Sequence, residues 1–149
     1  MKKNKLTIII IGVLVLLTLV LAVVHLTTRQ QEQEGALQVI QDGRTTLVYI
    51  EELKPVAAVN GTVTNNAGEE KQISGQGILV SDVLKLAGVD EESSVEVTAA
   101  DEYTVSLTAE EVAEGNTWLL IEDGTLRLIV FGDQGAKRNV KNVVRLTVD

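Results

Sequence analysis

An uninterrupted apolar segment near the N-terminus constrains this chain more than any other feature. Residues 6–26 read LTIIIIGVLVLLTLVLAVVHL and carry no formal charge when His25 is neutral. A helix rises about 1.5 Å per residue, so this segment spans the roughly 30 Å hydrocarbon core of a bilayer. We therefore expect residues 6–26 to form a transmembrane helix, preceded by a basic cytoplasmic tail at residues 1–5.

The charges that flank this segment predict its orientation. Lys2, Lys3 and Lys5 precede it, and the polar stretch TTRQQEQEG at residues 27–35 reads as a linker. A lysine excess on one side keeps that side in the cytoplasm. We expect a single-pass protein of the cell membrane, with the N-terminus cytoplasmic and residues 36–149 extracytoplasmic.

A cleaved signal peptide is the alternative to this signal anchor. Its apolar region would be about 7–15 residues long and would end in an A-x-A-like cleavage site. The segment at residues 6–26 is longer, and the sequence VVHLTTRQ at its end is a poor cleavage site. The pattern favours an anchor that is retained.

The residues after the span are acidic and contain no cysteine. Residues 30–149 carry all 21 acidic side chains and all of the 13 basic ones except Lys2, Lys3, Lys5 and Arg29, a net charge of about −12. This charge argues against nucleic acid or an anionic membrane surface as the main partner. The lack of cysteine excludes a lipoprotein anchor, a thiolate nucleophile and cysteine-ligated metals. It fits an exported bacterial domain that is stabilised by its core alone.

Histidine and carboxylate chemistry also find little support. His25, at the end of the span, is the single histidine, so residues 36–149 hold no Ser-His-Asp relay and no histidine metal site. Asp90-Glu91-Glu92 lacks the alternating spacing of a calcium loop and is predicted to be a solvated turn. Asp101-Glu102 beside Tyr103 is predicted to be a hairpin tip rather than an acid–base pair.

Short β-rich segments alternate with turn signals from residue 36 onward. Strands are expected at residues 37–40, 45–50, 56–64, 71–74, 95–99, 103–107, 117–121, 126–130 and 143–148. Asp42-Gly43 and Asp123-Gly124 are typical two-residue hairpin turns. The pattern predicts one α+β domain over residues 36–149, mostly β with two short helices.

Helix signals occur at two places between these strands. A helix is expected over residues 81–88, with Ser81 as N-cap and Gly88 in the left-handed C-terminal position. A second should begin at the capping box Thr108–Glu111 and end near Gly115. A brief helical turn is also expected at residues 51–54.

Positive charge gathers near the C-terminus. Residues 124–146 read GTLRLIVFGDQGAKRNVKNVVRL and contain Asp133 as their single acid. Gly132 and Gly135 let backbone N–H groups approach a ligand closely, and Arg138 can grip a phosphate with two hydrogen bonds. The spacing is not that of a P-loop. These residues indicate an anion-binding loop, and a solvated basic loop is the alternative. Phe131, which precedes Gly132, is expected either in the core or in the wall of the binding pocket.

The order of four segments resembles the oxidoreductase molybdopterin-binding domain, the central domain of sulfite-oxidase-like proteins. The segments are GILVSDVLKLAGVD, VEVTAADEYTVSLTAEEV, NTWLLIEDGTLRLIVFGDQGAKRNVK and NVVRLTV. The resemblance implies that fold and implies that Arg138, Asn139 and Lys141 contact the phosphate and pterin of the molybdenum cofactor. Arg127 matches the arginine of the strand that enters the loop. The candidate binding set is Arg127, Gly132, Gly135, Arg138, Asn139 and Lys141.

The chain departs from this family where the metal chemistry resides. The family's enzymes ligate molybdenum through a cysteine, which is absent here, and Phe131, Glu102 and Asn142 replace the usual proline, glycine and tryptophan. We expect a non-catalytic anchored domain that binds a phosphate-bearing small molecule or a membrane-associated redox protein through residues 132–141. The alternatives are a molybdopterin-dependent oxidoreductase with non-cysteine ligands and a protein–protein interaction domain.

Overall fold

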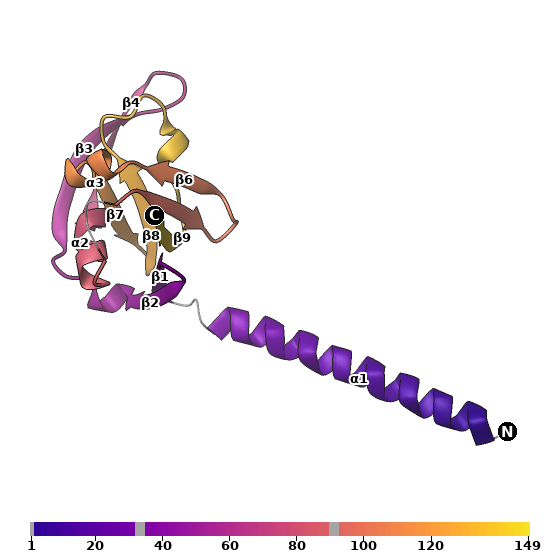
Figure 1. Ribbon diagram of the computed structural model, residues 1–149. Coiled ribbons are helices and arrows are strands. Elements are labelled where there is room, and N and C mark those ends of the chain that lie inside the picture. Colours follow the sequence, from indigo (N-terminus) through magenta and orange to yellow (C-terminus); the bar gives the residue numbers. More distant parts are fainter. Residues whose placement is uncertain (1, 32–34, 90–92) are drawn as a thin grey trace. The chain divides into compact units, whose positions relative to one another are not determined.

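A computed structural model describes residues 2–31, 35–89 and 93–149 (Figure 1). The chain divides into two compact units, residues 1–34 and 35–149, which are taken separately below. The acidic triplet Asp90-Glu91-Glu92, predicted to form a solvated turn, lies outside the described residues.

The first unit contains one helix, α1 (Lys2–Gln31). Its segment Thr7–Val24 is long and apolar enough to cross a membrane, as expected for residues 6–26. The helix continues beyond residue 26 into the polar stretch predicted to be a linker. Within the apolar part, the Thr18 hydroxyl donates to the carbonyl oxygens of Leu14 (3.1 Å) and Val15 (2.8 Å), so this hydroxyl is satisfied inside the helix.

The second unit contains a five-stranded sheet in the order β2-β1-β9-β5-β6. Its strands are β1 (Ala36–Gln41), β2 (Arg44–Tyr49), β5 (Val95–Ala99), β6 (Thr104–Leu107) and β9 (Val143–Val148). Neighbouring strands are antiparallel except for β1 and β9, which are parallel. This parallel pair joins the first and last strands of the unit, so the β1–β2 hairpin is attached to the rest of the sheet by a contact that is distant in sequence.

A four-stranded antiparallel sheet follows the order β3-β4-β7-β8. Its strands are β3 (Ala57–Thr64), β4 (Glu70–Leu79), β7 (Thr117–Glu122) and β8 (Thr125–Val130). The loop after β8 returns to both edges of this sheet. Leu128 N donates to Val140 O (2.8 Å) and Val140 N to Leu128 O (3.2 Å), and Thr64 forms a parallel bridge with Gln134.

The predicted mostly β architecture is confirmed, together with its two hairpin turns. Asp42 and Gly43 have φ of 51° and 75°, and Asp123 and Gly124 have φ of 49° and 75°. Two successive positive φ values match the right-handed twist of the strands that the turn connects. Asp and Gly tolerate this conformation better than other residues, which is why the sequence signal was reliable here.

The described helices of this unit are short. They are α2 (Val80–Leu86), α3 (Ala109–Ala113) and the 3₁₀ turns η1 (Ile50–Glu52) and η2 (Ala136–Arg138). The capping box is confirmed, because Glu111 N donates to Thr108 Oγ1 (3.2 Å) and Thr108 N to Glu111 Oε2 (2.9 Å). Gly88 has the expected left-handed conformation (φ 72°).

The prediction that Ser81 caps α2 is wrong. The helix begins one residue earlier, at Val80, and its N-cap Leu79 makes no side-chain capping bond. Val80 is fully buried, as are Val83 and Leu84 on the same helix. Burial of this apolar face at the end of β4 therefore sets the start of the helix in place of a polar cap.

Two apolar clusters hold the unit together. The larger is formed by residues of both sheets, α2 and α3; the smaller consists of Val59, Val63, Ile73, Leu120 and Ile129, with Trp118 and Phe131 packed against it. Leu119 belongs to the first cluster and Leu120 to the second, so β7 is apolar on both faces. Trp118 and Phe131 are partly buried and pack against the smaller cluster, so Phe131 takes the core position that was one of its two expected places.

Candidate functional site

The candidate site is the loop of residues 131–142, which connects β8 to β9. Gly132 and Gly135 adopt φ of 90° and 95°, a region that glycine enters without strain. They turn the chain into η2, after which Val140 rejoins the edge of β8. The glycines thus allow the loop to turn back toward the sheet.

Arg138 is neutralised inside the protein. Its Nε donates to Asp133 Oδ2 (2.8 Å), and its Nη2 contacts both Asp133 Oδ1 and Glu111 Oε1, the latter at 2.6 Å. All three side chains are less than one-third exposed. The guanidinium therefore lies between two carboxylates, one from its own loop and one from α3, and the alternative of a wholly solvated basic loop does not describe it.

Glu111 performs two structural roles with its two oxygens. Oε2 accepts from Thr108 N in the capping box, while Oε1 accepts from Arg138. The hydrogen bond from Arg138 lowers the pKa of Glu111 below its ordinary value, against a smaller opposing effect of burial. The hydrogen bonds to Asp133 and Glu111 in turn raise the pKa of Arg138. The ionised form of Glu111 is therefore the one that this contact favours.

Two further side chains fix the backbone of η2. Asn66 Oδ1, in the β3–β4 turn, accepts from Ala136 N (3.2 Å), and the Tyr103 hydroxyl donates to Lys137 O (3.0 Å). Together with Arg138, these contacts attach the loop to the β3–β4 turn, the β5–β6 hairpin and α3. The loop is consequently preorganised at its centre although it lies at the surface.

One cavity beside the loop brings together two of the predicted site residues. It has a volume of about 490 Å³ and is lined by Ala99, Ala100, Asp101, Tyr103, Asn139, Val140, Lys141 and Asn142. Lys141 supplies a positive charge, but Asp101 supplies a negative one to the same space. An anion in this cavity would therefore meet attraction and repulsion together.

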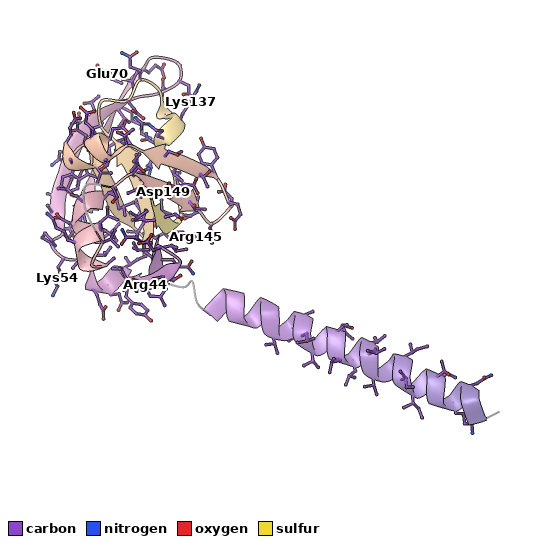
Figure 2. All side chains as sticks on the ribbon, viewed as in Figure 1. Arg44, Lys54, Glu70, Lys137, Arg145 and Asp149 are labelled. Atoms are coloured by element: carbon purple, nitrogen blue, oxygen red, sulfur yellow. The ribbon has the colours of Figure 1, made fainter. Side chains whose placement is uncertain are left out.

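A second cavity lies on the other side of η2, against the β3–β4 turn. It measures about 460 Å³ and is lined by Thr64, Asn65, Asn66, Gly68, Gln134, Gly135 and Lys137. Its lining has one cation, Lys137, and no carboxylate. Lys137 lies on the loop close to that turn (Figure 2), and it forms no ion pair within the described part of the chain.

The six predicted site residues thus separate. Asn139 and Lys141 line the first cavity, Gly135 lines the second, and Arg138 and Gly132 line neither. Arg127 lies within β8 opposite Leu120, and its Nη1 is 3.4 Å from Glu122 Oε1. The structure therefore places Arg127 on a sheet face instead of at the loop.

Sequence reasoning missed the polar groups that face Lys137. Thr64 was expected only to end a strand, and no binding role was assigned to Asn65, Asn66 or Gln134. Their contribution depends on the contact between two segments that are remote in sequence. The consecutive asparagines Asn65-Asn66 were the one sequence signal for this polar cavity, since a turn needs only one such residue and the second amide is then free to contact another segment.

The residues present do not fit a molybdenum cofactor. Arg138, which the resemblance assigns to the cofactor phosphate, is already neutralised by Asp133 and Glu111. Lys141 and Asn139 share their cavity with the carboxylate of Asp101. The chain also has no cysteine to ligate the metal. Arg138 and Lys141 therefore each have a carboxylate nearby, which disfavours a cofactor phosphate at either side chain.

In the comparison with known proteins, no protein-family model and no curated protein matches the chain. The structure shows an apolar N-terminal helix followed by a mostly β unit. The polar cavities of that unit flank a fixed loop.

Proposed function

We propose that this protein is a membrane-anchored, non-catalytic binding module that holds a phosphate-bearing ligand in the cavity beside Lys137. The observation that carries this proposal is the composition of that cavity, whose lining combines one cation with neutral polar side chains and no carboxylate. This function is consistent with a small relative of the molybdopterin-binding domain that retains the fold and lacks the catalytic activity. In that family, catalysis would require the cysteine that the chain lacks.

The fixed geometry of the loop supports binding at this site. Asn66 accepts a hydrogen bond from Ala136 N, and Tyr103 donates one to Lys137 O. The side-chain oxygen of Asn65 accepts from Ala67 N and Glu69 N, and its amide donates to the Glu69 carboxylate (all 2.9 Å), so this side chain is fixed as well. Little conformational entropy is then lost when an anion is bound. Lys137 and Gln134 remain exposed and supply the mobile donors.

The proposed location is the outer face of the cell membrane. The lysines in the first turns of α1, before its apolar segment, support an N-terminus in the cytoplasm and a second unit outside. Protease added to intact protoplasts should then remove residues 35–149 and leave α1 with the membrane. Full protection would contradict this topology, and release of the unit without protease would indicate a cleaved signal.

Titration of the full chain in detergent with pyrophosphate tests the binding site. A charge-assisted contact contributes about 1.5–3 kcal/mol, and each 1.4 kcal/mol is a factor of ten in affinity. Lys137→Ala should therefore weaken binding about tenfold or more. Lys141→Ala is the matched control on the same loop and should leave the affinity unchanged. No measurable wild-type affinity, or equal losses in both variants, would contradict the proposal.

A second candidate is docking of an acidic protein, such as a membrane-associated redox partner. Lys137 and Lys141 are both exposed, and neither forms an ion pair with a residue that the structure describes. Exposed charge of this kind mainly raises the association rate and makes it salt-dependent. A partner retained from membranes by the wild type and lost in the Lys137→Glu, Lys141→Glu double variant would favour this function.

A further inference from the structure

The outer edge of β2 differs from the other sheet edges in this unit. The edge of β8 is bridged at Leu128 by Val140, and β3 is bridged at its end by Gln134. The remaining edge, β6, is only four residues long and exposes Thr104 and Ser106. β2 has six residues, and nothing in residues 35–89 and 93–149 pairs with its outer side.

The hairpin register identifies the backbone groups that face outward from β2. Gln41 and Arg44 flank the two-residue turn and form the first hydrogen-bonded pair with β1. Hydrogen-bonded and non-hydrogen-bonded pairs then alternate along the strands. The N–H and C=O groups of Thr45, Leu47 and Tyr49 therefore point away from β1, toward solvent.

The side chains on this strand do little to prevent pairing. Leu47 and Tyr49 are 42% and 49% exposed, and they lie on the same face of the strand. Natural edge strands are usually protected by lysine, proline, bulges or short length. β2 has none of these within Thr45–Tyr49, so it retains the features of a strand that accepts a partner.

We propose that two copies of this chain pair through β2, antiparallel, with Leu47 opposite Leu47 of the second copy. In this register Thr45 lies opposite Tyr49 of the second copy. The outward-facing backbone N–H and C=O groups of Thr45, Leu47 and Tyr49 can then all form hydrogen bonds with those of the other β2 strand. The two five-stranded sheets join into one continuous sheet. The exposed Leu47 and Tyr49 side chains of both copies then lie side by side on one face.

Charge favours the antiparallel direction and therefore a second copy as the occupant. Arg44 lies at the start of β2 with Asp42 in the turn before it, and Glu51 and Glu52 follow the end of the strand; all four are exposed. Asp42 faces Glu52 in the antiparallel register, but parallel pairing would bring every one of these charges against its own copy. Antiparallel pairing brings Arg44 of each copy toward the acidic end of the other, whereas parallel pairing would place the arginines together. The surface is thus self-complementary, as a twofold interface requires. A shared membrane would add a high effective concentration.

Cysteine cross-linking of the full chain in lipid vesicles tests this pairing without interference, because the protein has no cysteine. Cα atoms of a hydrogen-bonded antiparallel pair are about 5.5 Å apart, which a disulfide spans. Leu47→Cys should cross-link to itself under mild oxidation. Thr45→Cys and Tyr49→Cys should cross-link to each other when mixed and much less when alone. Ser106→Cys, on the opposite edge of the same sheet, is the matched control.

Subunit counting by single-molecule photobleaching provides the second measurement. Leu47→Lys should convert dimers to monomers, and Thr104→Lys on β6 should leave the dimers intact. Cross-linking of Leu47→Cys no faster than that of Ser106→Cys would overturn the proposal. Dimers that persist in Leu47→Lys would also overturn it, because they would be formed by another surface such as α1.

Discussion

The Nη2 atom of Arg138 lies 2.6 Å from Oε1 of Glu111, which joins the β8–β9 loop to helix α3. The other oxygen of the same carboxylate caps α3 at Thr108. A single side chain therefore stabilises the start of a helix and fixes a loop that is remote in sequence. The arginine that the sequence offers for ligand binding is used to hold the binding loop in place.

Arg138→Ala should lower the free energy of unfolding by about 1–3 kcal/mol, the usual cost of leaving hydrogen-bonded polar groups without their partner. The substitution also leaves the carboxylates of Asp133 and Glu111 near each other without a cation. Lys141→Ala, a change to an exposed side chain on the same loop, should alter stability by no more than about 0.5 kcal/mol. Urea denaturation of both variants measures the difference, and equal stability of the two would contradict the role assigned to Arg138.

Acid should weaken this network through Glu111. The pKa of Glu111 is lowered in the folded state, mainly by the hydrogen bond from Arg138, so ionised Glu111 stabilises the fold. This contribution is fully present above the ordinary value of 4.5 and is lost as the pH falls through the lowered value. Glu111→Gln keeps a capping-box side chain but removes the charge.

The stability difference between the wild type and Glu111→Gln should therefore be constant near neutral pH and shrink below about pH 4.5. Thermal unfolding measured across this pH range would show it. A difference that persists unchanged into strong acid would mean that the charge of Glu111 does not contribute.

Local features of this fold were readable from the sequence because their causes are local. Asp42-Gly43, Asp123-Gly124 and the Thr108–Glu111 box each specify a conformation within a few residues, and each appears as expected. The start of α2 was misjudged because burial of Val80 outweighed the capping propensity of Ser81. Propensity is a weak guide where tertiary packing decides.

The long-range arrangement was not readable in the same way. The parallel pairing of β1 with β9 joins the ends of the unit, and no local pattern encodes it. Likewise, the sequence shows Arg138 beside glycines, which suggests a ligand-binding arginine. The structure shows that Arg138 forms ion pairs with Asp133 and Glu111. The position of the basic loop was therefore predictable, whereas the pairing of its charges depended on contacts between distant elements.

The contact between Gly61 and Phe131 predicts a steric test of the smaller cluster. A Cβ on Gly61 would lie 2.8 Å from ring atoms Cδ1 and Cζ of Phe131, so Gly61→Ala forces the ring to move. We expect a loss of about 1–3 kcal/mol from this overpacking. Asn60→Ala, at the adjacent exposed position of β3, should have little effect.

A double-mutant cycle separates this clash from a general intolerance of β3. In the Phe131→Ala background, Gly61→Ala should cost much less, because the ring that it would strike is gone. Additive losses in the double variant would show that the two residues do not interact.

The last prediction uses Asn66 to separate loop structure from anion binding. Asn66→Asp keeps an oxygen that accepts from Ala136 N, so stability should change by no more than about 0.5 kcal/mol. It also adds a negative charge to the lining of the Lys137 cavity. At low salt this charge should weaken pyrophosphate binding about fivefold or more, since unit charges about 4 Å apart interact by about 1 kcal/mol even in water. Added salt should reduce the difference between variant and wild type. Asn66→Ala removes the acceptor without adding charge, so any loss of affinity that it causes should depend less on salt. Equal pyrophosphate affinity of Asn66→Asp and the wild type at low salt would place the anion elsewhere on the protein.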